Sequence, residues 1–183
     1  VVESLLNLLD QGVYDPSSEQ IAANAVPPVS SRSLFRYFDD VHDLYRATIK
    51  EQQRRGVHIV NRDLHAGAPL ADRIAAITEQ RAELWTVLGP SARTARLRAH
   101  ASDAIADSIA VTRRFLRLQA AQLFAEELAA MPDEVAVSRL AAIDTLLEWE
   151  SWSLFIDDRG FDVARASEAL RHALTALLTP LES

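Results

Sequence analysis

The sequence predicts an all-α protein. Only 5 of its 183 residues are glycine, whereas alanine and leucine are abundant, and this composition favours helix over sheet. Apolar residues recur three and four positions apart along most of the chain, which is the spacing of a helix with one buried face. Proline, glycine and serine interrupt these patterns, so we expect about nine helices, arranged as an N-terminal three-helix domain and a C-terminal helical bundle.

The first three helices are short. Residues 1–11 carry one leucine-rich stripe, and Gly12 ends it. Pro16 and the two serines after it start a second helix, which ends near residue 25 because two prolines follow. Ser30 is a suitable N-cap for a third helix that reaches about residue 38.

Six longer patterns follow and form the expected bundle. Breaks are indicated by Gly67 and Pro69, by Gly89 and Pro90, and by the polar turn at 157–160, and Pro180 closes the last pattern. The expected helices span 39–64, 70–88, 91–101, 102–130, 132–156 and 161–178.

The second and third helices have the pattern of a helix-turn-helix. Ile21, Ala22 and Ala25 lie on one face of the first helix, and after a tight connection the second helix carries Leu34, Phe35 and Phe38, of which Leu34 and Phe38 are expected in the core. In such a motif the second helix can enter a DNA major groove and present its first turns to base edges. The alternative is an ordinary helical hairpin inside a bundle.

The residues of this motif resemble the N-terminal DNA-binding domain of TetR-family transcriptional regulators. The resemblance rests on Ile21-Ala22-Ala23, Val29-Ser30, Leu34-Phe35-Arg36-Tyr37-Phe38 and Leu44, and covers roughly the first fifty residues. It implies a DNA-binding domain over 1–46 and a ligand-binding and dimerisation domain over 47–183. It also implies a cytoplasmic homodimer that binds a palindromic operator DNA and a small-molecule effector.

The resemblance places the DNA contacts on the third helix. Its exposed first turn supplies the candidates for base edges, and the next turn supplies those for phosphate or sugar. The expected DNA-binding residues are Ser31, Arg32, Ser33, Phe35, Arg36 and Tyr37. Two features depart from the family: the turn over 25–30 is two residues longer and lacks its glycine, and Val41 stands where a phosphate-binding lysine is usual.

The charge of the chain argues against tight non-specific DNA binding. The net charge is −7, and the first 46 residues alone carry −4. Three arginines at positions 93, 96 and 98 form a basic cluster. We expect them either to face solvent or to contact the acidic residues Asp39, Asp40 and Asp43.

The last two helices predict a dimer interface. Both are apolar over a wider arc than one core requires, and their alanines allow close approach; Leu181 extends the stripe of the last helix. The resemblance implies a four-helix interface here, two from each subunit. The expected interface residues are Leu146, Ala166, Leu170, Ala173 and Leu177. The alternative is that both stripes belong to the core of one subunit.

The tryptophans indicate a possible effector pocket, although tryptophans in helical bundles are more often core residues. The resemblance implies a cavity inside the C-terminal bundle, with a few polar groups that orient a largely apolar ligand. The expected ligand-binding residues are Trp85, His100, Phe115, Trp149 and Trp152. Arg81 and Glu148 are further polar candidates; the alternative is that they pair with each other or face solvent.

Other classes of function lack support in the sequence. The chain has no cysteine and no apolar run long enough to span a membrane, and its first residues do not form a signal peptide. His58 and His65 lack an acidic partner at metal-ligand spacing, and no catalytic or phosphate-binding motif occurs, so we expect no enzyme, no metal and no cofactor.

These observations favour a ligand-responsive transcriptional regulator, a repressor released from its operator by a small molecule. The alternative is a helical ligand-binding or interaction protein of the same fold that does not bind DNA. The acidic N-terminal segment and Val41 favour the alternative, whereas residues 30–38 favour the regulator. A basic arm upstream of Val1 in the full gene product would favour the regulator.

Overall fold

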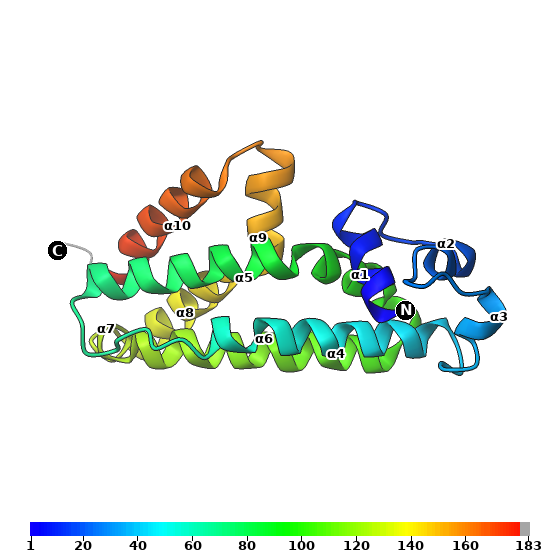
Figure 1. The fold of residues 1–183 in the computed structure, drawn as a ribbon. Helices are drawn as coiled ribbons and strands as arrows, with labels where there is room; N and C mark the ends of the chain where they lie inside the picture. The colour runs from blue at the N-terminus through cyan, green and yellow to red at the C-terminus, as the bar shows by residue number, and fades with distance from the viewer. Residues whose placement is uncertain (180–183) are drawn as a thin grey trace. The chain divides into compact units, whose positions relative to one another are not determined.

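The computed structural model describes residues 1–179 and is all-α, with no strand in that range (Figure 1). A 3₁₀ turn at Ala99–Ala101 and a π-helical turn at Leu154–Asp158 join longer elements. The ten α-helices are α1 (Val2–Asp10), α2 (Ser18–Ala23), α3 (Ser31–Leu34), α4 (Val41–Val60), α5 (Leu70–Arg98), α6 (Asp103–Leu123), α7 (Ala125–Ala129), α8 (Asp133–Leu147), α9 (Trp149–Ser153) and α10 (Val163–Leu178).

The chain divides into two compact units. Unit 1 contains residues 1–57 and 87–111, and unit 2 contains 58–86 and the described part of 112–183. Helices α4, α5 and α6 therefore each contribute to both units. This division differs from the expected boundary at residue 46, because the end of α5 and the start of α6 pack with the N-terminal helices.

The core of unit 1 joins the first helices to these later segments. Its buried residues come from α1, α2, α3 and the start of α4, together with Ala95 of α5 and Ile105 of α6. The Ser4 hydroxyl of α1 donates a hydrogen bond of 2.5 Å to the carbonyl of Ile21 in α2. The three N-terminal helices are thus held by a core that they do not build alone.

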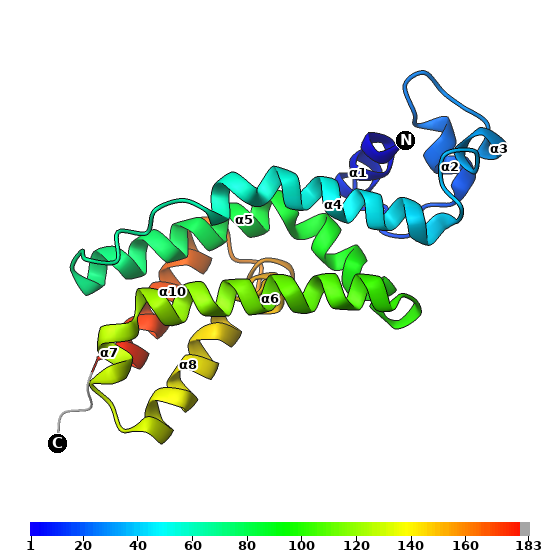
Figure 2. The same ribbon diagram turned by 90° about the horizontal axis from the view of Figure 1, so that it is seen from below.

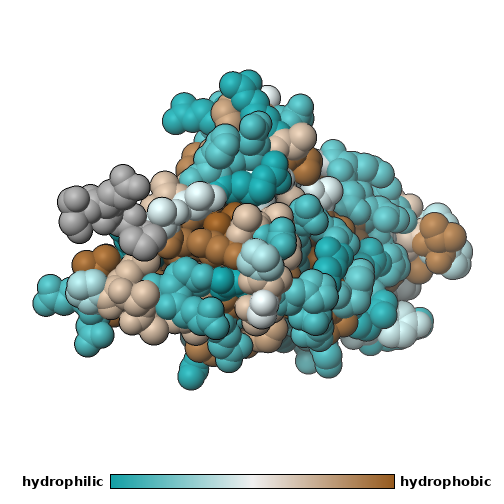
Figure 3. All heavy atoms as spheres, turned by 90° about the vertical axis from the view of Figure 1, so that its left-hand side faces the viewer, coloured by the Kyte–Doolittle hydropathy of each residue, from teal (hydrophilic) through white to brown (hydrophobic). Residues whose placement is uncertain are grey.

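The core of unit 2 is made by the first part of α5, the second part of α6, and α7, α8 and α10. Helices α8 and α10 pack against each other. The buried cluster contains Leu64, Ile74, Ile77, Ala120, Leu123, Phe124, Leu128, Ile143, Leu147, Leu174 and Leu178. In Figure 3, brown apolar side chains show among teal polar ones near the centre of the face turned to the viewer.

Several predicted helix ends are confirmed. Ser17 caps α2, with Gln20 completing a reciprocal pair of side-chain bonds to the backbone, and Ser30 caps α3. Gly12 follows α1 with a φ of +83°, a conformation that glycine adopts without the steric cost of a side chain.

Four helix predictions are wrong in detail. Pro90 does not end a helix, because α5 continues through it to Arg98. The expected helix over 102–130 is divided at Phe124, and the one over 132–156 is divided at Glu148, whose backbone is extended. The third helix is also shorter than expected, because residues 35–37 form turns after Leu34.

Bonds from side chains explain the break after α8. At the end of α8, the Trp85 indole donates to the Leu147 carbonyl at 2.9 Å and the Ser151 hydroxyl donates to the Thr145 carbonyl at 2.6 Å. These donors replace the backbone N–H groups that a continuous helix would supply.

None of the helices in residues 1–179 is both long and apolar enough to cross a membrane. The expected stop at Pro180 and the expected stripe residue Leu181 lie outside the described residues.

Candidate functional site

The connection between α2 and α3 is held by backbone and serine bonds. The Val29 amide donates to the Ala22 carbonyl at 3.1 Å, which closes the turn. Ser30 then accepts from the Ser33 amide at 3.2 Å and starts α3. Leu34 is fully buried, so it fixes which side of α3 faces the core.

The opposite side of α3 and its following turn is exposed. Arg32, Phe35, Arg36 and Tyr37 all face solvent, whereas Ser31 and Ser33 are half-buried. The Arg36 guanidinium lies 4.9 Å from the centre of the Tyr37 ring and donates to the Tyr37 hydroxyl at 2.8 Å. Figure 2 shows α2 and α3 close together with the connecting loop between them. The structure therefore brings the expected DNA-binding residues onto one short segment.

Some acidic residues near this segment form hydrogen bonds or ion pairs. Asp40 accepts a bond of 2.7 Å from the Asp43 amide at the start of α4, and Arg46 pairs with Asp43 at 3.1 Å. At the start of α2, the pKa of Glu19 is lowered by its own backbone amide and by the Ser17 hydroxyl. Unit 1 as a whole contains nine basic and ten acidic residues, so it is close to neutral.

The basic cluster at the end of α5 fixes the link between α1 and α2. Arg98 forms an ion pair with Asp15 and stacks over the Tyr45 ring at 3.9 Å, and Arg93 lies over the Tyr14 ring at 5.1 Å. Arg98 thus pairs with Asp15 rather than with the acidic start of α4. These contacts join α5 to the segment that leads into α2.

The expected effector residues are dispersed. Trp85 and Trp152 are buried in unit 2, Trp149 is half-buried, and Phe115 lies exposed on α6. His100 is exposed in the 3₁₀ turn of unit 1. The Trp85 indole N–H is used to hold the end of α8, which is a structural role that the sequence did not indicate.

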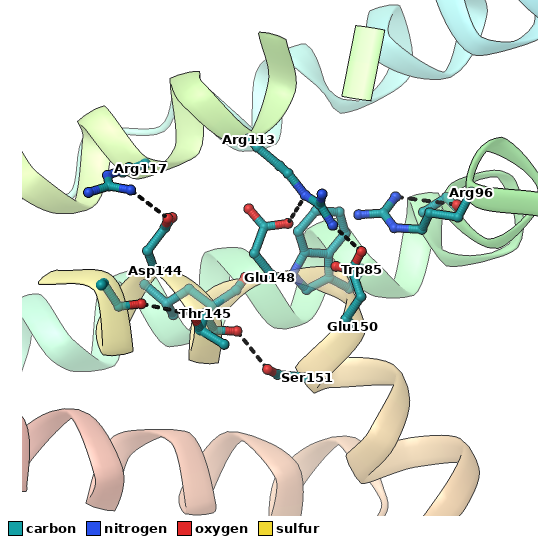
Figure 4. Close-up of polar contacts among 12 residues, drawn as sticks. Trp85, Arg96, Arg113, Arg117, Asp144, Thr145, Glu148, Glu150 and Ser151 are labelled. Carbon is teal, nitrogen blue, oxygen red and sulfur yellow. Dashed lines mark hydrogen bonds and ion pairs between the residues drawn. The ribbon is translucent and has the colours of Figure 1, made fainter. Parts of the chain in front are cut away.

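Unit 2 contains a charged cavity of about 330 Å³ between α6 and the break after α8. Arg113 pairs there with Glu148 at 3.4 Å and with Glu150, and Arg117 pairs with Asp144 at 3.7 Å (Figure 4). Burial raises the pKa of Asp144, although the nearby arginines oppose this effect. The sequence predicted an apolar pocket, whereas the side chains that line this cavity are largely charged and form salt bridges with one another.

Arg81 does not form an ion pair with Glu148. It is fully buried and donates to Gln119 at 2.9 Å and to the Leu116 carbonyl at 3.2 Å, while its Nε has no partner among the described residues. Burial lowers the pKa of Arg81 to about 10. Gln119 in turn donates to the Val60 carbonyl at 2.8 Å, so these side chains join α4, α5 and α6 within unit 2.

The expected interface residues divide by burial. Ala166 and Leu170 are fully buried within the chain itself. Leu146, Ala173 and Leu177 are half-buried and keep some accessible surface.

Sequence reasoning missed the ionic cluster of Arg113, Asp144, Glu148 and Glu150. The only local signal is the recurrence of charge on 113–117 and 144–150, which usually indicates a solvated face. Among the described residues, no three histidine or acidic side chains gather as a metal site.

Comparison with protein-family models, with curated proteins and with solved structures finds no match to this chain. The TetR resemblance therefore depends on the motif residues themselves.

Proposed function

We propose that the protein is a homodimeric transcriptional regulator that binds operator DNA through α3 and responds to a small molecule. The observation that carries the proposal is the exposed set of Arg32, Phe35, Arg36 and Tyr37, held on a segment whose Leu34 is fully buried. Such a segment offers a guanidinium for guanine edges and a second cationic group for phosphate.

A two-fold homodimer is part of the proposal because a palindromic operator requires two copies of α3. On α8 and α10, Leu146, Ala173 and Leu177 are half-buried and keep accessible surface for such a contact. The effector, a largely apolar small molecule, is supported by the resemblance. It would act by binding one conformation of the dimer better than the other.

The test begins with selection of a duplex from a random pool by the purified protein. We expect Arg32→Ala to lose roughly 1–3 kcal/mol at one base position and to relax the preference there. Tyr37→Ala should weaken binding to all sequences more evenly, because it removes a contact to the backbone rather than to a base. Equal binding by wild type and both variants would show that α3 does not carry the contact.

A second candidate is a helical interaction protein that does not bind DNA. The observation that favours it is the charge of unit 1, where acidic residues outnumber basic ones. DNA-binding surfaces normally carry excess positive charge, because release of phosphate counterions supplies much of their affinity. Failure of the selection to enrich any duplex would decide for this candidate.

A further inference from the structure

The charged cavity beside the end of α8 contains two polar groups whose hydrogen-bonding capacity the surrounding protein does not use. Its volume of about 330 Å³ lies at the lower end of the range that small-molecule sites occupy. The residues that line it all belong to unit 2: Arg113, Asp144, Thr145, Glu148, Glu150 and Ser151. The cavity therefore has room for a small ligand and offers it charges of both signs.

The first of these groups is the carboxylate of Asp144. Arg117 is its ion-pair partner, at an N···O distance of 3.7 Å that is too long for a hydrogen bond. Within residues 1–179 no donor forms a hydrogen bond to this carboxylate, although its side chain is only 22% exposed. A carboxylate has lone pairs on both oxygens, so a cationic donor in the cavity would stabilise its charge.

The second group is Nη1 of Arg113. The guanidinium of this residue donates from Nε to Glu148 at 3.4 Å and from Nη2 to Glu150. Its Nη1 donates no hydrogen bond to the part of the chain that the structure describes. Figure 4 shows this side chain reaching from α6 toward the end of α8, where Glu148 lies between Asp144 and Glu150 in the view. The N–H groups of Nη1 are therefore left for an anionic partner.

The charges at the cavity balance. Its three carboxylates interact with three guanidinium groups, those of Arg81, Arg113 and Arg117. A simple anion would meet all three carboxylates, and the described acidic side chains do not gather as a metal site. Separate positive and negative groups with balanced charge favour a ligand that is also neutral overall and carries one group of each sign.

We infer that this cavity binds a free amino acid, with its ammonium group on Asp144 and its carboxylate on Nη1 of Arg113. The hydroxyls of Thr145 and Ser151 donate to backbone carbonyls, so their oxygens keep lone pairs that can also accept from the ammonium group. This ligand differs from the largely apolar effector of the proposed regulator, and its binding does not require that α3 contacts DNA.

Thermal unfolding of the purified protein with each proteinogenic L-amino acid in turn tests this site, because a ligand that binds the native state raises the melting temperature. For an amino acid that does so, isothermal titration then compares its dissociation constant with those of two analogues. One is the amine that lacks the carboxylate, and the other is the carboxylic acid that lacks the amine. Each analogue should bind roughly tenfold more weakly or worse, because each loses one charge-assisted contact.

These analogues are tested on the wild-type chain, so the result does not depend on whether a variant folds. A chain that no amino acid stabilises would overturn the inference. So would an amine that binds as tightly as its amino acid, because the cavity would then be a site for simple cations.

Matched variants assign the two contacts. Asp144→Asn and Arg113→Gln should each raise the dissociation constant of the amino acid roughly tenfold or more. Asp158→Asn and Arg114→Gln remove the same charges at exposed positions outside the cavity lining and should bind like wild type. Circular dichroism shows whether the variants remain folded. Binding that is equal in wild type and in a folded Asp144→Asn variant would contradict the role given to this carboxylate.

Discussion

At the scale of single residues, two buried arginines in unit 2 are stabilised in different ways. Arg73 forms an ion pair with Glu127, with one N···O distance of 2.9 Å, and donates to the Ala68 carbonyl at 2.9 Å. Arg81 donates hydrogen bonds to neutral acceptors, and burial lowers its pKa to about 10, although the charges of Glu148 and Asp144 oppose this effect. A paired arginine ties segments together, whereas an unpaired buried one costs desolvation free energy.

The Arg73–Glu127 pair makes a prediction about pH. The Arg73 side chain lowers the pKa of Glu127, so the pair contributes stability above the ordinary glutamate pKa of 4.5. That contribution is lost as the pH falls through the lowered native pKa. Glu127→Gln should therefore cost about 2 kcal/mol of unfolding free energy at neutral pH, less than a fully buried pair.

Urea unfolding at several pH values checks this prediction. The difference between wild type and Glu127→Gln should stay constant down to about pH 4.5 and shrink below it. Glu126→Gln, at the exposed neighbouring position, is the control and should show little effect at any pH. A difference that does not depend on pH would contradict the role given to the ion pair.

At the scale of elements, the break between α8 and α9 depends on a distant side chain. The Leu147 carbonyl at the end of α8 accepts from the Trp85 indole, 62 positions away in the sequence. Trp85→Phe keeps a buried ring but removes this donor. We expect a loss of about 1–3 kcal/mol in unfolding free energy, because a buried carbonyl then lacks a partner.

Trp152→Phe is the matched control, because Trp152 is equally buried and its indole has no hydrogen bond among the described residues. Chemical unfolding of both variants measures the difference. Equal destabilisation would mean that loss of ring area, rather than the indole bond, determines the result.

This break also shows what the sequence could not predict about the elements. Starts of helices were predictable at Ser17 and Ser30, because a cap acts within three residues of its own position. The break at Glu148 has no glycine or proline, and its stabilising donor comes from α5. A local sequence pattern around residue 148 cannot indicate that the Trp85 indole donates to this break.

The same reasoning applies to the candidate sites. The exposure of Arg32, Arg36 and Tyr37 was predictable, since Leu34 and its apolar neighbours define the buried side of a short helix. The cavity lined by Arg113 and Glu148 was not predictable, because it lies between α6 and the break at Glu148, which the sequence did not indicate. The sequence also could not decide whether Ala166 and Leu170 are buried in the core, because an apolar stripe is equally typical of a core and of an interface.

At the scale of the whole molecule, three long helices contribute to both compact units. The DNA-binding segment of the proposal lies in unit 1, and the charged cavity lies in unit 2. Within unit 1, Arg98 at the end of α5 forms an ion pair with Asp15 in the segment before α2. The end of α5 is therefore tied to the segment that precedes α2.

The central claim is that α3 is the surface that meets DNA. Hydrogen–deuterium exchange of the protein with and without a selected duplex measures this most directly. The account predicts slower exchange over residues 30–38 when the duplex is bound, because DNA covers that segment and restricts its opening. A bound duplex that leaves 30–38 unchanged and protects another segment would contradict the account.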